Sequence, residues 1–250
     1  MNPVLERVYE IGIIPVIAFN SVDEAIPLCK ALMDGGLPAA EVTFRTACAE
    51  ECIRKIHQEL PDMLLGAGTV LTTEQADRAM DAGASFIVAP GFDPIVTQHV
   101  IDKGGIMMPG TATAGEMQQA MNMGCEAIKF FPAEANGGVD KLKNIGAALK
   151  TAKWMCTGGV NAKNVNNYLA YPQIIAVGGT WMCKSDKIKA GAWDEITAMS
   201  KEAVDVMLGL ELGHIGINCA DDAEAMKTAE TLGSLLSMAV KPGNSSIFVG

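Results

Sequence analysis

The sequence predicts a (β/α)8 barrel followed by a short C-terminal extension. Short apolar runs recur at intervals of roughly 20 to 27 residues, the length of one βα unit. Each run ends in Gly, Pro, Thr or Asn and precedes a helix-like segment. Eight such units occupy about 200 residues, which suits a small barrel of this class, and the chain of 250 residues leaves an appendage.

The eight expected strands are short and apolar. In chain order they are "IIPVIAF" from Ile13, "AAEVTF" from Ala39, "MLLGAG" from Met63, "SFIVAP" from Ser85, "GIMMPG" from Gly105, "EAIKFF" from Glu126, "KWMCTGG" from Lys153 and "QIIAVGG" from Gln173. A doubly wound open sheet is the competing architecture. The lack of a GxGxxG fingerprint makes that sheet the weaker choice.

Helix signals lie between these runs. Ser21, with Glu24 three residues later, forms a capping-box pattern that predicts a helix closed by the glycines at 35–36. A second helix is expected from Thr72 or its neighbour to Gly83. Helices in these positions would alternate with the strands, as the barrel requires.

The composition is typical of a compact α/β enzyme, with 49% hydrophobic residues and few aromatic ones. A net charge of −10 argues against nucleic acid or an anionic membrane as partner, so local groups must hold any anionic substrate. The seven cysteines form no CxxC and no zinc-ligand spacing, which indicates reduced thiols. The N-terminal stretch fits neither a signal peptide nor a membrane span, so we expect a soluble, cytoplasmic protein.

Two charged residues stand inside strands that otherwise read as buried. Alternation places Glu41, Thr43 and Arg45 on the inner face of the second strand, and Lys129 and Phe131 on that of the sixth. These strands oppose each other in an eight-stranded ring, so the carboxylate and the amine are expected to meet. A desolvated lysine can be a neutral amine that attacks carbonyl groups. A structural ion pair, or a lysine that extends to water, remains an alternative.

Glycine-rich motifs follow three of the strands. "TGGVN" at 157–161 and "VGGTW" at 177–181 place backbone N–H groups where barrels of this class bind phosphate. "GAGT" at 66–69 combines glycines that let a ligand approach the backbone with the hydroxyl of Thr69. The alternatives are an ordinary turn for each glycine pair and relief of crowding for the third motif.

The three histidines, His57, His99 and His214, fall in helix-like segments or in the tail. None stands at a strand end, so a histidine-built metal site is not expected. No Ser-His-Asp, Cys-His or EF-hand pattern appears. We therefore expect neither a metal nor another cofactor.

Six motifs in their order resemble those of the 2-dehydro-3-deoxy-6-phosphogluconate (KDPG) and 4-hydroxy-2-oxoglutarate (KHG) aldolase family. They are "EVTFRT", "GAGTVL", "PGTAT", "AIKFFPAEANGG", "TGGVN" and "GGTW", within about residues 5–204. The resemblance implies a metal-independent class I aldolase on a (β/α)8 barrel, commonly a homotrimer. Such an enzyme splits KDPG into pyruvate and glyceraldehyde 3-phosphate in the Entner–Doudoroff pathway. KHG or another 2-keto-3-deoxy sugar acid is the alternative substrate.

The resemblance also implies roles for individual residues. Lys129 would form the Schiff base and Glu41 would move protons. The implied substrate contacts are Arg45 and Thr69 for the pyruvyl carboxylate, Phe131 around the imine, Gly158, Gly159, Gly179 and Thr180 for the phosphate, and Pro90 and Thr111 as lining residues. This chain departs from the family pattern at "AFNS", where many members carry a basic residue, and at Thr180, where serine is frequent.

The barrel is expected to span residues 1–204 and the extension residues 205–250. "LELGHIGINCADDAEAMKTAETLG" predicts a strand, a turn and a helix, and "SSIFVG" a further strand. The extension faintly resembles the opening of a glyoxalase-like (vicinal oxygen chelate) module, of which one histidine cannot build the metal site. A role in packing or oligomerisation is therefore expected.

Two other functional classes remain open. A metal-dependent sugar-phosphate epimerase or isomerase on the same barrel would lose activity with a chelator. A non-catalytic sugar-phosphate sensor would bind its ligand without turnover, and would leave the pairing of Glu41 with Lys129 unexplained.

Overall fold

A computed structural model describes residues 1–209, 216–236, 238–243 and 247–249. The chain divides into two units, Met1–Gly209 and Leu210–Gly250. The first unit contains every element that the sequence assigns to the barrel.

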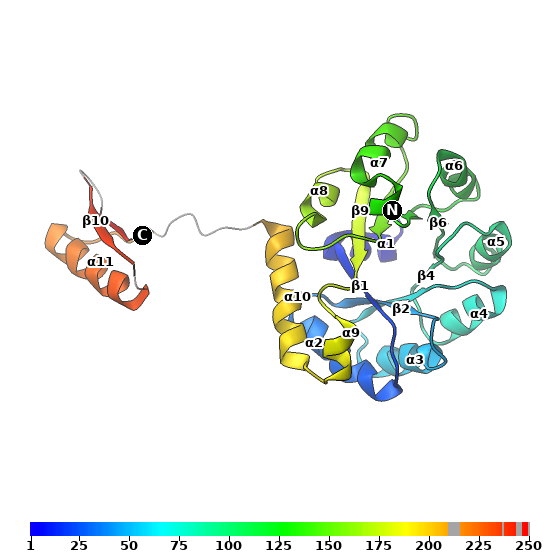
Figure 1. The fold of residues 1–250 in the computed structure, drawn as a ribbon, viewed down its shortest axis with the longest axis horizontal. Coiled ribbons are helices and arrows are strands. Elements are labelled where there is room, and N and C mark those ends of the chain that lie inside the picture. The colour runs from blue at the N-terminus through cyan, green and yellow to red at the C-terminus, as the bar shows by residue number, and fades with distance from the viewer. Residues whose placement is uncertain (210–215, 237, 244–246, 250) are drawn as a thin grey trace. The chain divides into compact units, whose positions relative to one another are not determined.

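The first unit is a parallel barrel surrounded by helices α2 to α8 (Figure 1). Its strands are β1 Ile13–Ile17, β2 Ala39–Thr43, β3 Leu64–Gly68, β4 Phe86–Val88, β5 Met107–Met108, β6 Gly110–Thr111, β7 Ile128–Phe130, β8 Trp154–Thr157 and β9 Ile174–Gly179. They are hydrogen-bonded in the order β5-β4-β3-β2-β1-β9-β8-β7-β6. The predicted fold class is confirmed.

The fifth expected strand consists of two pieces, and these pieces close the ring. β5 pairs with β4 and β6 pairs with β7, so the two ends of the strand order are joined by a single residue, Pro109. Proline has no N–H to donate to a sheet, but its carbonyl accepts a hydrogen bond from the N–H of Lys129 at 2.9 Å. The break in the strand therefore leaves the backbone of β7 anchored.

The helices of the first unit alternate with its strands. They are α1 Pro3–Ile11, η1 Val22–Glu24, α2 Ala25–Asp34, α3 Ala49–Glu59, α4 Thr73–Asp81, α5 Pro94–Asp102, α6 Ala114–Asn122, η2 Glu134–Asn136, α7 Gly138–Gly146, α8 Val165–Leu169, α9 Ser185–Lys189 and α10 Trp193–Leu208. The helix expected to begin near Thr72 is α4, whose first turn is capped by the Thr72 hydroxyl.

The capping box expected at the start of α2 takes a different form. The Ser21 hydroxyl accepts from the N–H of Asp23 at 3.2 Å, whereas the Glu24 carboxylate accepts from Asn20 at 2.9 Å and not from Ser21. The side chains thus close a short 3₁₀ turn, η1, and α2 begins only at Ala25. The expected box is therefore wrong in its partners, although both residues do satisfy N–H groups at this helix start.

Helix α1, which the sequence analysis did not identify, closes one end of the barrel. Its buried Leu5 and Val8 belong to the same apolar cluster as Ile14, Leu64 and Phe86, which begin or lie near the beginning of their strands. This cluster fills the barrel at the amino ends of the strands. The carboxyl ends remain for a functional site, as in other barrels of this class.

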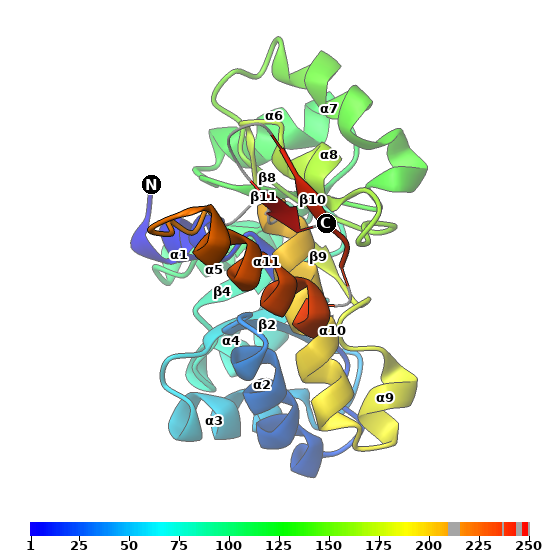
Figure 2. The same ribbon diagram turned by 90° about the vertical axis from the view of Figure 1, so that its left-hand side faces the viewer.

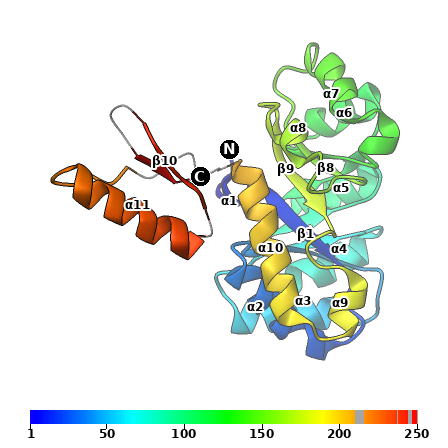
Figure 3. The same ribbon diagram turned by 60° about the vertical axis from the view of Figure 1, so that its left-hand side comes forward.

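The first unit extends to Gly209 because α10 continues past the boundary expected at 204/205. This helix packs along α2 and α9 (Figures 2 and 3). Ala203 is buried, and Val204 and Met207 also pack against the core around the barrel. The expected boundary would cut through the last turns of the helix, so we place it after Gly209, where φ is 60°.

The second unit contains α11 Asp222–Leu236 and an antiparallel pair, β10 Val240–Pro242 and β11 Ile247–Val249, that packs on this helix (Figure 1). The expected helix and final strand are confirmed, and β10 was not expected. Residues 216–219 form no strand, contrary to the prediction, and His214 with the rest of that segment lies outside the described residues. Within the described ranges, no helix is long and apolar enough to span a membrane.

Candidate active site

Lys129 and Glu41 meet inside the barrel, as strand alternation predicts. The Lys129 Nζ donates to Glu41 Oε1 at 3.0 Å and to Oε2 at 3.3 Å. Lys129 is 5% exposed and Glu41 is 1% exposed. β7 and β2 supply the two residues from opposite walls of the barrel. A buried amine thus lies in direct contact with a group that can accept and return a proton.

The glycines of "GAGT" make room for neighbouring side chains. A Cβ on Gly68 would overlap the carboxylate of Glu41, and a Cβ on Gly66 would overlap the ring of Phe86. The expectation that these glycines admit a ligand to the backbone is therefore replaced by the alternative, relief of crowding. Gly68 in particular allows Glu41 to reach Lys129.

Gly68→Ala should lower turnover by about tenfold to a hundredfold, the scale for a misplaced catalytic group, because the added methyl displaces the Glu41 carboxylate. Steady-state kinetics measures the loss, and circular dichroism checks that the fold is retained. Gly91→Ala is the matched control, because no described residue lies within 4 Å of a Cβ at that position. Equal activity in the two variants would contradict this reading of Gly68.

Arg45 and Thr69 come together where β2 and β3 end. The Arg45 Nε donates to Thr69 Oγ1 at 3.3 Å, and the guanidinium forms no ion pair with the described residues. Thr69 has a φ of 58°, a left-handed conformation that is rare for a β-branched residue. Such strain is found mainly at functional sites. The pair presents a cation and a hydroxyl side by side at the mouth of the barrel.

Two further predicted residues contact Lys129, and a third, Pro90, lies beside Gly110, the partner of Lys129 in the sheet. The ring of Phe131 lies with its centroid 5.5 Å from the Lys129 Nζ. The Thr111 hydroxyl donates to the carbonyl of Lys129 at 2.9 Å, so its proton is already used to hold β7. The backbone of Pro90 lies where a Cβ on Gly110 would be, so position 110 has no space for a larger residue. Thr111 therefore holds the strand that carries the lysine, whereas Pro90 packs against the neighbouring strand, β6.

The loop after β8 exposes backbone donors. Gly158 and Gly159 have φ values of 102° and 84°, which only glycine adopts readily. Their carbonyls accept hydrogen bonds from the Glu134 N–H at 3.0 Å and from the Asn161 side chain at 3.0 Å. In the described part of the chain, no acceptor pairs with either glycine N–H. The loop is held through its oxygens and leaves its nitrogens available to an anion.

A carboxylate that sequence reasoning overlooked packs against this loop. The Tyr168 hydroxyl donates to Glu134, and a Cβ on Gly159 would lie 2.6 Å from the Glu134 Cβ. Burial, together with this carboxylate, raises the pKa of Tyr168, so its hydroxyl keeps the proton that it donates. Glu134 therefore explains why position 159 requires glycine.

At the end of β9, a side chain packs against the glycine that was expected to bind the phosphate. Gly179 is the last, buried residue of β9, and a Cβ there would overlap the ring of Trp181. Thr180 follows it and is exposed at the rim of a pocket. On the neighbouring strand, Thr157 is 8% exposed, and its hydroxyl has no hydrogen-bond partner among the described residues. Its place at a strand end could have marked it from the sequence.

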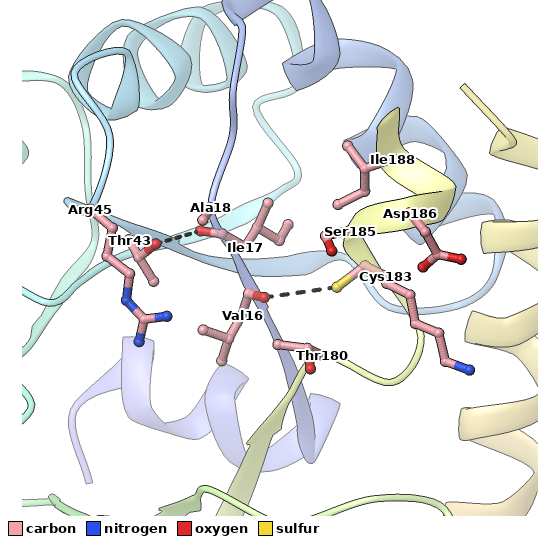
Figure 4. A pocket seen from close by; sticks show the side chains of 11 residues that line it. Val16, Ile17, Ala18, Thr43, Arg45, Thr180, Cys183, Ser185, Asp186 and Ile188 are labelled. Carbon is pink, nitrogen blue, oxygen red and sulfur yellow. Dashed lines mark hydrogen bonds between the residues drawn. The ribbon is translucent and has the colours of Figure 1, made fainter. Parts of the chain in front are cut away.

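The pocket has a volume of about 400 Å³ and lies between the ends of β1 and β2 and the loop after β9 (Figure 4). Thr43 and Arg45 lie on one side, and Cys183, Ser185 and Asp186 on the other. Lys184 also lines it, whereas Lys129 and Glu41 do not. Residues 183–186 were missed, although they directly follow a strand-end motif.

The structure contains no histidine at the barrel mouth within the described ranges. His57 lies in α3 and His99 in α5, where its ring forms a 2.7 Å hydrogen bond with Asp77. Among the residues described, no three His, Cys, Asp or Glu side chains are grouped to hold a metal ion.

Comparison with known proteins identifies the family. Residues 4–199 match the family model for KDPG and KHG aldolase. The chain belongs to this aldolase family. A 2-dehydro-3-deoxy-phosphogluconate aldolase from Treponema pallidum (strain Nichols) is 41% identical to this chain over 207 residues. The matched residues cover 83% of this chain and 99% of the relative.

Other members agree in sequence and in fold. A KHG/KDPG aldolase from Escherichia coli (strain K12) is 38% identical, with 77% of this chain and 91% of the relative covered. The structure of a KDPG aldolase from Legionella pneumophila, with pyruvate captured as a covalent carbinolamine, superimposes with a TM-score of 0.77 at 35% identity. That comparison covers 80% of this chain and 97% of the other. The family resemblance of the motifs is thus confirmed.

Proposed function

We propose that this protein is a class I aldolase that cleaves KDPG into pyruvate and glyceraldehyde 3-phosphate. The observation that carries the proposal is the buried contact of 3.0 Å between the Lys129 amine and the Glu41 carboxylate. A buried ion pair contributes little to stability on average, so stability alone does not account for it. The family relatives named for KDPG cleavage, and the pyruvate carbinolamine in one of them, support the same chemistry.

The two residues divide the chemistry between a nucleophile and a proton carrier. As a neutral amine, Lys129 adds to the C2 carbonyl, and loss of water from the carbinolamine gives an iminium ion. The iminium accepts the electron pair of the C3–C4 bond as Glu41 takes the proton of the C4 hydroxyl. The aldehyde leaves, Glu41 returns a proton to C3 of the enamine, and hydrolysis of the iminium releases pyruvate and Lys129.

The surrounding groups orient the substrate in this proposal. Arg45 and Thr69 bind the pyruvyl carboxylate, because a guanidinium and a hydroxyl lie together at the barrel mouth. Phe131 shapes the space around the imine, and Pro90 and Thr111 position the backbone beside it. The phosphate is received by a set at the ends of β8 and β9, namely Gly158, Gly159, Gly179 and Thr180.

Trapping with borohydride tests the proposal. Incubation with pyruvate and sodium borohydride should add a reduced pyruvyl group to the protein, and peptide mass spectrometry should place it on Lys129. Protein treated with borohydride alone is the control. A parent protein that cleaves no 2-keto-3-deoxy acid and acquires no adduct would contradict the aldolase proposal, as would an adduct confined to another lysine.

KHG is the second candidate substrate, since the matching family model covers both activities. The free N–H groups of Gly158 and Gly159 favour the phosphorylated substrate, because charge-assisted hydrogen bonds to a dianion contribute on the order of 1.5–3 kcal/mol each. We expect kcat/KM for KDPG to exceed that for KHG, and for the unphosphorylated sugar acid, by at least about tenfold. Equal values would contradict the assignment of the phosphate site.

The proposal also includes the cofactor requirement, cellular location, assembly and pathway of the enzyme. It acts without a metal or another cofactor, as a cytoplasmic homotrimer in the Entner–Doudoroff pathway, with no nucleic acid or membrane as partner. The second unit serves in packing or oligomerisation, because one helix and two strands bury too little surface for independent stability. Light scattering of the full chain and of residues 1–209 tests the assembly; a monomeric full chain would contradict the trimer.

A further inference from the structure

A positively charged segment borders the pocket that lies at the ends of β1 and β2. Residues 184–189, "KSDKIK", contain three lysines and one aspartate, a local balance of +2 in a chain whose net charge is −10. Of these residues, Lys184, Ser185, Asp186 and Ile188 line the pocket, and so does Thr180, the last residue of the proposed phosphate set. Cationic and hydroxyl groups therefore converge next to the place where the substrate's anionic end is expected.

Lys184 is available to a ligand. It is exposed, and it forms no ion pair with any carboxylate in the described ranges, whereas Lys187 pairs with Glu195 at 2.5 Å. Burial raises the pKa of the neighbouring Cys183 to about 12, so that thiol is neutral at pH 7 and does not repel an anion. Among the residues that the structure describes, Asp186 is the one carboxylate that lines the same pocket.

The opposite rim of this pocket lacks a cation where the first strand ends. Val16, Ile17 and Ala18 line it, and Asn20 beyond them is neutral, with its backbone N–H bonded to Glu24 at 2.9 Å. Arg45 lines the pocket too, but its Nε is bonded to Thr69 at the carboxylate end of the site. Lys184 is thus the remaining cation of the pocket that can meet a distal anion.

We propose that Lys184, with the Ser185 hydroxyl, is a specificity-determining contact for the distal phosphate of the substrate. It approaches the phosphate from the β1 side of Thr180, whereas the Gly158–Gly159 loop approaches from the β8 side. The inference rests on the proposed function and adds a residue to it.

The test compares Lys184→Met with Lys189→Met. Lys184 directly precedes α9, and Lys189 is an exposed lysine at the end of α9 that does not line the pocket. In Lys184→Met, kcat/KM for KDPG should fall roughly tenfold, chiefly through KM, and the loss should shrink at high ionic strength. Cleavage of the unphosphorylated sugar acid and trapping of pyruvate by borohydride should stay within about twofold of the parent. Lys184→Arg should restore most of the preference, and Asp186→Asn should increase it.

Each outcome has one meaning. Parent-like kcat/KM for KDPG in Lys184→Met, or an equal loss with Lys189→Met, would overturn the role of Lys184. An equal loss on the phosphorylated and unphosphorylated acids would also overturn it, because the effect would not depend on the phosphate. If the parent protein neither traps pyruvate nor cleaves either acid, the proposed function itself fails, whatever the Lys184 variant shows.

Discussion

Lys129→Ala should lower the rate of KDPG cleavage at least about a thousandfold, equivalent to about 4 kcal/mol in the activation free energy. The reason is that Lys129 is the only buried lysine in the described part of the chain, and its amine is in contact with the proton-accepting carboxylate of Glu41. No other amine in this part of the chain can take its place inside the barrel. A coupled assay of pyruvate release measures the rate.

Two further variants test whether Lys129 acts as a nucleophile or only as a positive charge. Lys129→Arg keeps a cation opposite Glu41 but should be as inactive as Lys129→Ala, because a guanidinium stays protonated. Lys150→Ala removes an exposed lysine and should leave the rate unchanged. Since loss of a buried partner leaves a carboxylate unpaired, circular dichroism should accompany the assay. Cleavage within about tenfold of the parent in either folded Lys129 variant would contradict a Schiff-base mechanism.

The strands of the barrel were predictable because the information that defines them is local. Apolar runs that end in turn-forming residues mark β2 at Ala39 and β3 near Met63 to within a residue. The division of the fifth strand follows from Pro109, which is also a local feature. The division becomes visible only when it is known that β5 pairs with β4 and β6 pairs with β7.

The burial of helix α1 could not be predicted from local sequence. Its caps are readable, since the Asn2 side chain accepts from Val4, Pro3 starts the helix and Gly12 ends it with a φ of 71°. The reason for its burial is not local, because Leu5 packs against residues from strands throughout the barrel.

The catalytic pair was predictable because alternation and ring geometry together fix directions in space. Glu41 and Lys129 lie 88 positions apart, yet their strands must oppose each other in an eight-stranded ring. The partners of the glycines could not be predicted in this way. Gly68 faces Glu41, and Gly159 faces Glu134. Which residues of two neighbouring elements face each other depends on their register, and the register is known only from the folded structure.

Glu41→Gln should slow exchange of the pyruvate methyl protons with solvent by about a hundredfold or more, the usual scale for a general base. The amide fits the space that Gly68 leaves, and its oxygen can still accept from Lys129, but it cannot take up a proton. Pyruvate should therefore still be trapped on Lys129 by borohydride while its methyl exchange becomes slow. Proton NMR in deuterated buffer measures the exchange, with Glu59→Gln, an exposed carboxylate at the end of α3, as the control. If both variants exchange at the parent rate, water or another group moves the proton, and Glu41 serves only to orient the amine.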